Sequence, residues 1–228
     1  MKKIIIALDG PAGSGKTTTA KRVADELGYL YIDTGAMYRA VTQAWIESNK
    51  PESDIDEEHM EDFIKNLTIH LKQSDEGQKT LLNGKDVSYE IRLPEVTRLV
   101  SPVSAVACVR EWLVDEQRHL GEHGGVVMDG RDIGTVVFPQ AELKIYLIAS
   151  PEARAHRRYL EMKAKGMEAN EEEIKDAIIA RDKYDSSRDH SPLRKAEDAI
   201  EIDTSDLSFD EQTKMVIELA KKAMHDSK

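Results

Sequence analysis

The sequence has only one cysteine, Cys108, and few aromatic residues, which make up 5% of its 228 residues. A single thiol cannot form an intramolecular disulfide, and no Cys/His spacing typical of a zinc site is present. Apolar runs are short as well. The run near the N-terminus, Ile4 to Leu8, is too short for a membrane span or a signal peptide. We therefore expect a soluble cytoplasmic protein in which Cys108 is a small core residue.

Basic residues are also scarce, because 32 Lys+Arg face 43 Asp+Glu and the net charge is −11. This balance argues against a broad surface for nucleic acid or anionic membrane. Any anionic ligand must therefore be held by local arginines. The length fits one sizeable domain with insertions better than two full domains. We expect a monomer that binds small molecules, with no nucleic-acid or membrane partner.

A phosphate-binding motif follows the first apolar run. The run stops at Asp9, and the residues from Gly10 to Thr17 have the spacing G-x-x-x-x-G-K-T. Glycines at this spacing bring main-chain N–H groups close to a polyphosphate, and the next helix points its positive end at the same anion. The alternative is a glycine-rich turn without a ligand. The residues expected to bind ATP are Gly10, Pro11, Ala12, Gly13, Ser14, Gly15, Lys16, Thr17 and Thr18.

Lys16, Thr17 and Asp129 have specific roles in the expected donor site. Lys16 can reach the β- and γ-phosphates, and the Thr17 hydroxyl can join the shell of Mg²⁺. Asp129 follows another apolar run, at the position where this architecture places the carboxylate that organises Mg²⁺ and its waters. Its alternative role is that of a structural turn residue.

Apolar runs alternate with helical patterns along the chain. The expected strands are Ile4–Leu8, Tyr29–Ile32, Gly125–Met128, Lys144–Ala149 and Ile200–Ile202. This alternation predicts an α/β fold with a five-stranded parallel sheet that binds ligands at the carboxyl ends of its strands. Period-two patterns between Leu67 and Leu82 and the turn Asn83-Gly84 predict a small antiparallel unit of about three strands. We also expect one long helix between Ser101 and Leu120.

Arginines cluster late in the chain. Ser150-Pro151 begins a helix on which Arg154, Arg157 and Arg158 share one face, and a second helix leads to Arg188. The segment from Arg154 to Arg188 is predicted to be a mobile lid, and the alternative is a solvated helix pair with ion pairs. A charged residue early in a helix that follows a strand, such as Arg39, points towards the ligand crevice.

Three classes of function share such a phosphate loop. A GTP switch should carry a guanine-reading Asn-Lys-x-Asp, which is missing, and a motor ATPase needs a larger chain. A small-molecule kinase uses the loop, a second anion site and a lid together. No aspartate is identified as a catalytic base, and an acceptor phosphate needs none, because its second pKa is about 6. The predicted catalysis is alignment and charge neutralisation of two anions.

Four motifs carry a resemblance to a known family. They are GPAGSGKTT at 10–18, DTGAMYR at 33–39, DGRDIGTVVFP at 129–139, and the spacing Arg181, Asp185, Arg188. Together they resemble the bacterial-type cytidylate kinases over nearly the whole chain. The resemblance implies a single domain with a P-loop core (1–38, 93–150 and 196–228), a monophosphate-binding insert (about 39–92) and a helical lid (about 151–190).

The resemblance also implies Mg²⁺-assisted transfer of the ATP γ-phosphate to CMP or dCMP. Its catalytic residues would be Lys16, Arg131, Arg181 and Arg188. Its CMP-binding residues would be Thr34, Arg39, Ser101, Arg110, Arg131, Asp132, Arg181, Asp185 and Arg188. Asp132 would accept a hydrogen bond from the cytosine amine and repel the carbonyl of uracil, while Arg110 would donate to ring acceptors. The alternatives are a kinase for another monophosphate such as UMP and a non-catalytic ATP-binding module.

Overall fold

The computed structural model describes residues 3–74 and 77–226. The chain divides into two compact units. The first unit comprises residues 1–31 and 121–228, and the second comprises residues 32–120. No described helix is both long enough and apolar enough to cross a membrane.

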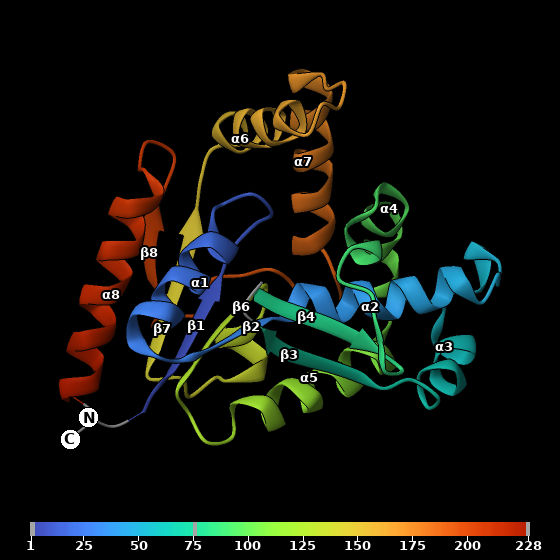
Figure 1. Cartoon of the computed structure of the whole chain (residues 1–228), viewed down its shortest axis with the longest axis horizontal. Coiled ribbons are helices and arrows are strands. Elements are labelled where there is room, and N and C mark those ends of the chain that lie inside the picture. The colour runs from blue at the N-terminus through green and yellow to red at the C-terminus, as the bar shows by residue number, and fades with distance from the viewer. Residues whose placement is uncertain (1–2, 75–76, 227–228) are drawn as a thin grey trace. The chain divides into compact units, whose positions relative to one another are not determined.

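A five-stranded sheet forms the core of the first unit (Figure 1). In spatial order its strands are β2 (Leu30–Asp33), β6 (Val126–Gly130), β1 (Ile5–Asp9), β7 (Leu143–Ile148) and β8 (Ile200–Asp203). β1 pairs in parallel with both β6 and β7, and β7 pairs in parallel with β8. The continuous apolar run of β1 is explained by this central position, because Ile6, Ala7 and Leu8 are fully buried. The predicted parallel α/β core is confirmed.

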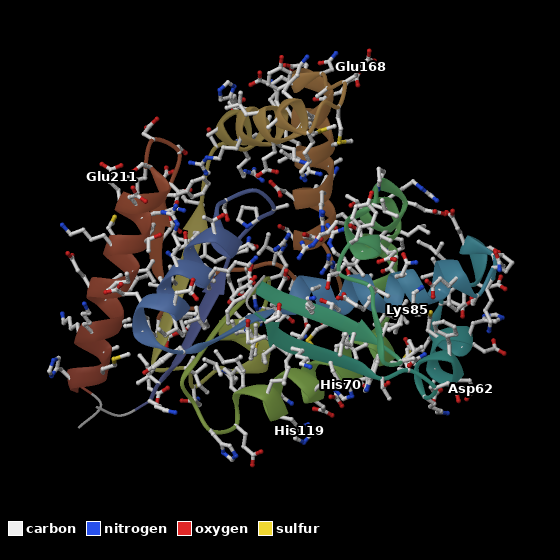
Figure 2. The ribbon with its side chains drawn as sticks, viewed as in Figure 1. Asp62, His70, Lys85, His119, Glu168 and Glu211 are labelled. Atoms are coloured by element: carbon white, nitrogen blue, oxygen red, sulfur yellow. The ribbon has the colours of Figure 1, made fainter. Side chains whose placement is uncertain are left out.

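The described part of the first unit contains four α-helices. They are α1 (Lys16–Leu27), α6 (Pro151–Ala164), α7 (Glu171–Ser186) and α8 (Phe209–Asp226). α1 and α8 lie side by side, and their buried residues Val23 and Val216 share one core with the strands (Figure 1). α8 begins with a reciprocal capping box, in which the Ser208 N–H donates to the Glu211 carboxylate (2.9 Å) and the Glu211 N–H donates to Ser208 Oγ (3.3 Å; Glu211 is labelled in Figure 2).

The second unit has its own hydrophobic core and a small antiparallel sheet. Its α-helices are α2 (Thr34–Glu47), α3 (Glu57–Ile64), α4 (Pro94–Val103) and α5 (Ala107–Gly121). The last residue of α5, Gly121, is already assigned to the first unit. The sheet consists of β3 (Ile69–Ser74), β4 (Gly77–Leu82) and β5 (Lys85–Asp86). The turn residues Asn83 and Gly84 both have positive φ angles, as the predicted hairpin turn requires. The small antiparallel unit is therefore confirmed.

The expected single helix between Ser101 and Leu120 is wrong, because α4 ends at Val103 and α5 begins at Ala107. Ser104 Oγ donates to the Ser101 carbonyl (3.0 Å), a local bond that competes with helix continuation. The Glu57 carboxylate then accepts from the Ala107 N–H (3.0 Å) and the next N–H (2.9 Å), which caps the new helix. This cap comes from a distant helix, so apolar periodicity within 101–120 does not reveal the break.

Candidate functional site

The loop between β1 and α1 has the backbone that a phosphate cradle needs. Gly10 has φ 144°, and a Cβ atom there would lie 2.0 Å from the Leu147 carbonyl oxygen. Gly15 has φ 89° and is the N-cap of α1, where a Cβ would lie 2.8 Å from Gln212 Nε2. Both positions therefore require glycine, and the chain can bend back over the start of α1.

The N-terminus of α1 lacks the usual protein cap. Among the described residues, α1 has no side-chain capping bond and no acidic residue in its first turn. By contrast, α2, α6 and α7 are capped by Asp33, Ser150 and Asn170. The first-turn N–H groups of α1 and the positive end of its dipole are therefore suited to an anionic ligand.

Lys16 lies inside this loop and is 5% exposed. Its Nζ donates to the Pro11 carbonyl (2.6 Å) and to Ser14 Oγ (3.3 Å). Burial, followed by the positive charge of Arg131, lowers the pKa of Lys16 well below its usual value. The negative charge of a polyphosphate would favour the charged form of Lys16 and so oppose both effects, which suits the loop to a highly anionic ligand.

The two predicted Mg²⁺ ligands lie together. Thr17 Oγ1 donates to Asp129 Oδ2 (2.8 Å), and the Tyr31 hydroxyl donates to Asp129 Oδ1 (2.9 Å). A hydroxyl and a carboxylate are oxygen donors of the kind that Mg²⁺ selects. The described residues contain no group of three or more His, Cys, Asp or Glu able to hold a metal ion. Mg²⁺ takes most of its ligands from water and substrate phosphates and needs few from the protein.

Three arginines surround Asp185, which is 1% exposed. Arg131 Nε donates to Asp185 Oδ2 (3.0 Å), and Arg188 donates to Asp185 Oδ1. The Nε of Arg181 lies 3.9 Å from Asp185 Oδ2. The structure therefore brings Arg181 and Arg188 together with Arg131 around the carboxylate of Asp185.

The pKa values reflect this excess of positive charge. Burial opposes ionisation of Asp185, but the charges of the surrounding arginines outweigh it and lower the pKa of Asp185. Burial, and then the charge of Arg131, lower the pKa of Arg181 to about 10. Arg131 and Arg181 still repel each other although Asp185 and Asp182 act on Arg181, so this cluster can accept a further anion.

In the second unit, α2 carries two of the predicted CMP-binding residues. Thr34 is 3% exposed at the first position of the helix. Arg39, one turn later, is half-buried and donates to Thr97 Oγ1 (2.9 Å) and the Ile91 carbonyl (3.2 Å). The N-cap residue of α2 is Asp33, whose carboxylate accepts from the Ala36 N–H (2.9 Å).

The other two predicted residues of this unit, Ser101 and Arg110, are linked through Ser104 at the junction of α4 and α5. Arg110 is 3% exposed, and its Nη1 donates to the Ser104 carbonyl (2.9 Å). The Ser104 hydroxyl in turn donates to the carbonyl of Ser101 (3.0 Å). The guanidinium carbon of Arg110 also lies 5.1 Å from the ring centroid of Tyr38, which restricts its orientation.

The predicted residues thus form two sets. Thr34, Arg39, Ser101 and Arg110 belong to the second unit. The phosphate loop, Asp129, Arg131, Asp132, Arg181, Asp185 and Arg188 belong to the first unit.

Two residues of the first unit have roles that the sequence did not indicate. Tyr31 orients Asp129, as described above. Arg154 was expected on an arginine-lined lid face with Arg157 and Arg158, but it is 3% exposed. It donates to the carbonyls of Ala149 (2.9 Å) and Ala12 (3.1 Å) and so supports the phosphate loop. Burial by a distant loop cannot be read from helical spacing alone.

Comparison with known proteins gives concordant results. The family model described as cytidylate kinase matches residues 6–222. A cytidylate kinase of Bacillus cereus (strain ATCC 10987 / NRS 248) is 51% identical over 219 residues, 96% of this chain and 96% of the relative. One of Bacillus thuringiensis (strain Al Hakam) is 52% identical over 217 residues, 95% of each chain.

Among solved structures, an uncharacterized protein from Eubacterium ventriosum ATCC 27560 superposes with a TM-score of 0.51 at 14% identity, covering 97% of this chain and 99% of that one. This likeness concerns the fold alone. The family match and the Bacillus relatives extend over nearly the full length, and the matched residues 6–222 span all the motifs described above. The chain therefore belongs to the cytidylate kinase family.

Proposed function

We propose that this protein is a kinase that transfers the γ-phosphate of ATP to the phosphate of CMP or dCMP, giving CDP or dCDP. The observation that carries the proposal is the charge arrangement of the first unit. Lys16 of the phosphate loop lies within electrostatic reach of Arg131 and Arg181, which are gathered around Asp185. Such an arrangement suits two polyanions that must approach each other.

The donor is held by the loop of residues 10–18. Main-chain N–H groups and the N-terminus of α1 face the phosphates of ATP, and Lys16 exchanges the Pro11 carbonyl for phosphate oxygens. Thr17 and Asp129 would hold Mg²⁺, partly through water. When bound, the ion would neutralise charge on the donor phosphates.

Arginines hold and activate the acceptor. Arg39 and Arg131 bind the acceptor phosphate, and Arg181 and Arg188 stabilise the charge of the transferred group. The acceptor phosphate takes over guanidinium donors that Asp185 now occupies. Asp185 is then able to contact the sugar.

The base is read by hydrogen bonds. Asp132 accepts from the exocyclic amine of cytosine, while Ser101 and Arg110 donate to its ring acceptors. Uracil presents a carbonyl in place of the amine, so Asp132 disfavours UMP. The Thr34 hydroxyl contributes to CMP binding near the base.

The phosphate acceptor is anionic near neutral pH, so the reaction needs alignment and charge neutralisation rather than a general base. The helical segment 151–190 acts as a lid that excludes water from the γ-phosphate. In this proposal the protein works as a cytoplasmic monomer on small-molecule substrates.

A coupled assay with CMP, dCMP, UMP, AMP and dTMP tests the proposal. We expect the highest kcat/KM with CMP or dCMP. Lys16→Ala should lower kcat by about 10²-fold or more, because the lysine neutralises charge that grows during transfer. Preference for UMP, or near-normal turnover by Lys16→Ala, would contradict the proposal.

A further inference from the structure

A buried carboxylate that has no role in the proposed function ties the acceptor residues to the phosphate loop. Asp9 is the last residue of β1 and is 5% exposed. Its Oδ1 accepts from the Ile133 N–H (2.9 Å), and its Oδ2 accepts from the Gly134 N–H (2.7 Å). Both oxygens are therefore used by main-chain donors of one distant segment.

These bonds fix the main chain on one side of Arg131 and Asp132. On the other side, Gly130 is the in-register partner of Asp9 in the pairing of β6 with β1. Arg131 and Asp132 are the only residues between the two fixed points. The main chain of Asp9 lies opposite Gly130 in the sheet, and its carboxylate binds the N–H groups of Ile133 and Gly134. Asp9 therefore fixes the main chain on both sides of Arg131 and Asp132.

Asp9 also takes the place of a local helix cap. Residues 133–137 form one turn of π-helix whose N-cap position is Asp132. Within this described segment the side chain of Asp132 makes no capping hydrogen bond to the helix. An aspartate at an N-cap normally accepts from N–H groups of the first turn. Here Asp9 accepts from those groups, so Asp132 need not turn its carboxylate back onto the helix.

We propose that Asp9 is a positioning residue for the acceptor: it holds Arg131 and Asp132 at the carboxyl end of β1, beside the loop that binds the donor. This inference rests on the proposed function, in which Arg131 binds the acceptor phosphate and Asp132 reads cytosine. Because Gly10 follows Asp9 directly, one residue sets the starting points of both the donor loop and the acceptor segment.

The test compares Asp9→Asn with wild type. Asparagine has nearly the same shape but only one acceptor oxygen, and its NH₂ group would face a main-chain donor. We expect the KM for CMP to rise about tenfold, as for the loss of a buried hydrogen bond, with a smaller rise in the KM for ATP. We also expect the ratio of kcat/KM for CMP to that for UMP to fall.

Asp203→Asn is the matched control. Asp203 also ends a strand of the same sheet, and its carboxylate accepts from the Ser205 N–H (2.9 Å) and hydroxyl (2.6 Å), but it is exposed. We expect this variant to keep both KM values and the CMP-to-UMP ratio.

A double-mutant cycle with Asp132→Ala separates the inference from the proposed function. If Asp9 acts through Asp132, the double variant should have the same CMP-to-UMP ratio as Asp132→Ala alone. If Asp132→Ala leaves the ratio unchanged, the base-reading role is wrong, and the anchor is then judged by the KM for CMP. An unchanged KM for CMP in Asp9→Asn, or an equal rise in both KM values, would overturn the inference even if thermal stability falls.

Discussion

At the scale of single residues, Asp9 also gives the protein an unusual titration. Burial raises the pKa of Asp9 to about 7, although the N–H donors of Gly134 and Ile133 oppose the rise. The charge of Asp132 adds to it, and that of Lys16 opposes it. The Tyr146 phenol also interacts with Asp9. A carboxyl group with a raised pKa makes the folded state less stable once it ionises.

The stability of the wild-type protein should therefore fall as the pH rises through this range. An unfolded aspartate ionises near 3.8 and the folded one near 7, so the stabilising effect is complete at low pH and is lost as pH rises through about 7. Between about pH 5 and about pH 8, wild type should lose more free energy of unfolding than Asp9→Asn, as measured by urea denaturation. Equal losses would show that Asp9 titrates normally.

Single residues differ in how far the sequence predicts them. Lys16 and Thr17 could be proposed as donor-site residues because both lie within one local motif. Asp129 could be proposed because it follows a recognisable apolar run, and its bond to Thr17 shows that the two lie together. The contacts of Tyr31 and Asp9 span large sequence separations and depend on the order of strands, which local patterns do not give.

At the scale of elements, a helix start capped by its own segment could be predicted, whereas starts capped by a distant residue were missed. Ser150 was identified from the pattern Ser-Pro, and its hydroxyl caps α6 as expected. The junction between α4 and α5 was missed because its cap, Glu57, comes from another helix. The π-helix at 133–137 was missed for the same reason, since Asp9 supplies its N-terminal acceptors.

The α6–α7 pair carries the prediction that belongs to this scale. Arg188 follows α7, donates to Asp185 and lies 5.7 Å from the Tyr184 ring centroid. We expect Arg188→Ala to lower kcat by about 10²–10³-fold while ATP binding changes little, because the arginine acts on charge that develops during transfer. Steady-state kinetics and titration with a non-hydrolysable ATP analogue provide the measurement.

Arg158→Ala is the control for this prediction. Arg158 lies on α6, is exposed, and pairs with Glu161 at 3.1 Å, an exposed ion pair of little energetic weight. It should leave kcat unchanged. A loss of ATP affinity in Arg188→Ala without a change in kcat would assign Arg188 to the donor site instead.

At the scale of the whole molecule, the protein is acidic but concentrates positive charge where the substrates are proposed to bind. The net charge is −11, yet Lys16, Arg131, Arg181 and Arg188 share one region; Asp185 pairs with the arginines, while Asp129 and Asp9 act on Lys16. Burial and mutual repulsion of these positive charges oppose folding, and the lowered pKa values of Lys16 and Arg181 express this cost. Stability is therefore given up at the site that the reaction uses.

Arg181→Met should make the protein more stable and less active. Methionine keeps much of the side-chain length without the charge, so we expect the free energy of unfolding to rise by about 1 kcal/mol, while kcat falls.

CMP at about 100 times its Kd should stabilise wild type by about 2.7 kcal/mol, since it binds only the folded state. At the same CMP concentration the variant should gain less, because part of the phosphate site is missing. Thermal denaturation with and without CMP measures both effects, and cytidine, which lacks the phosphate, is the control ligand. If the Arg181→Met variant is less stable than wild type and CMP stabilises it fully, Arg181 supports the fold rather than binding the acceptor phosphate.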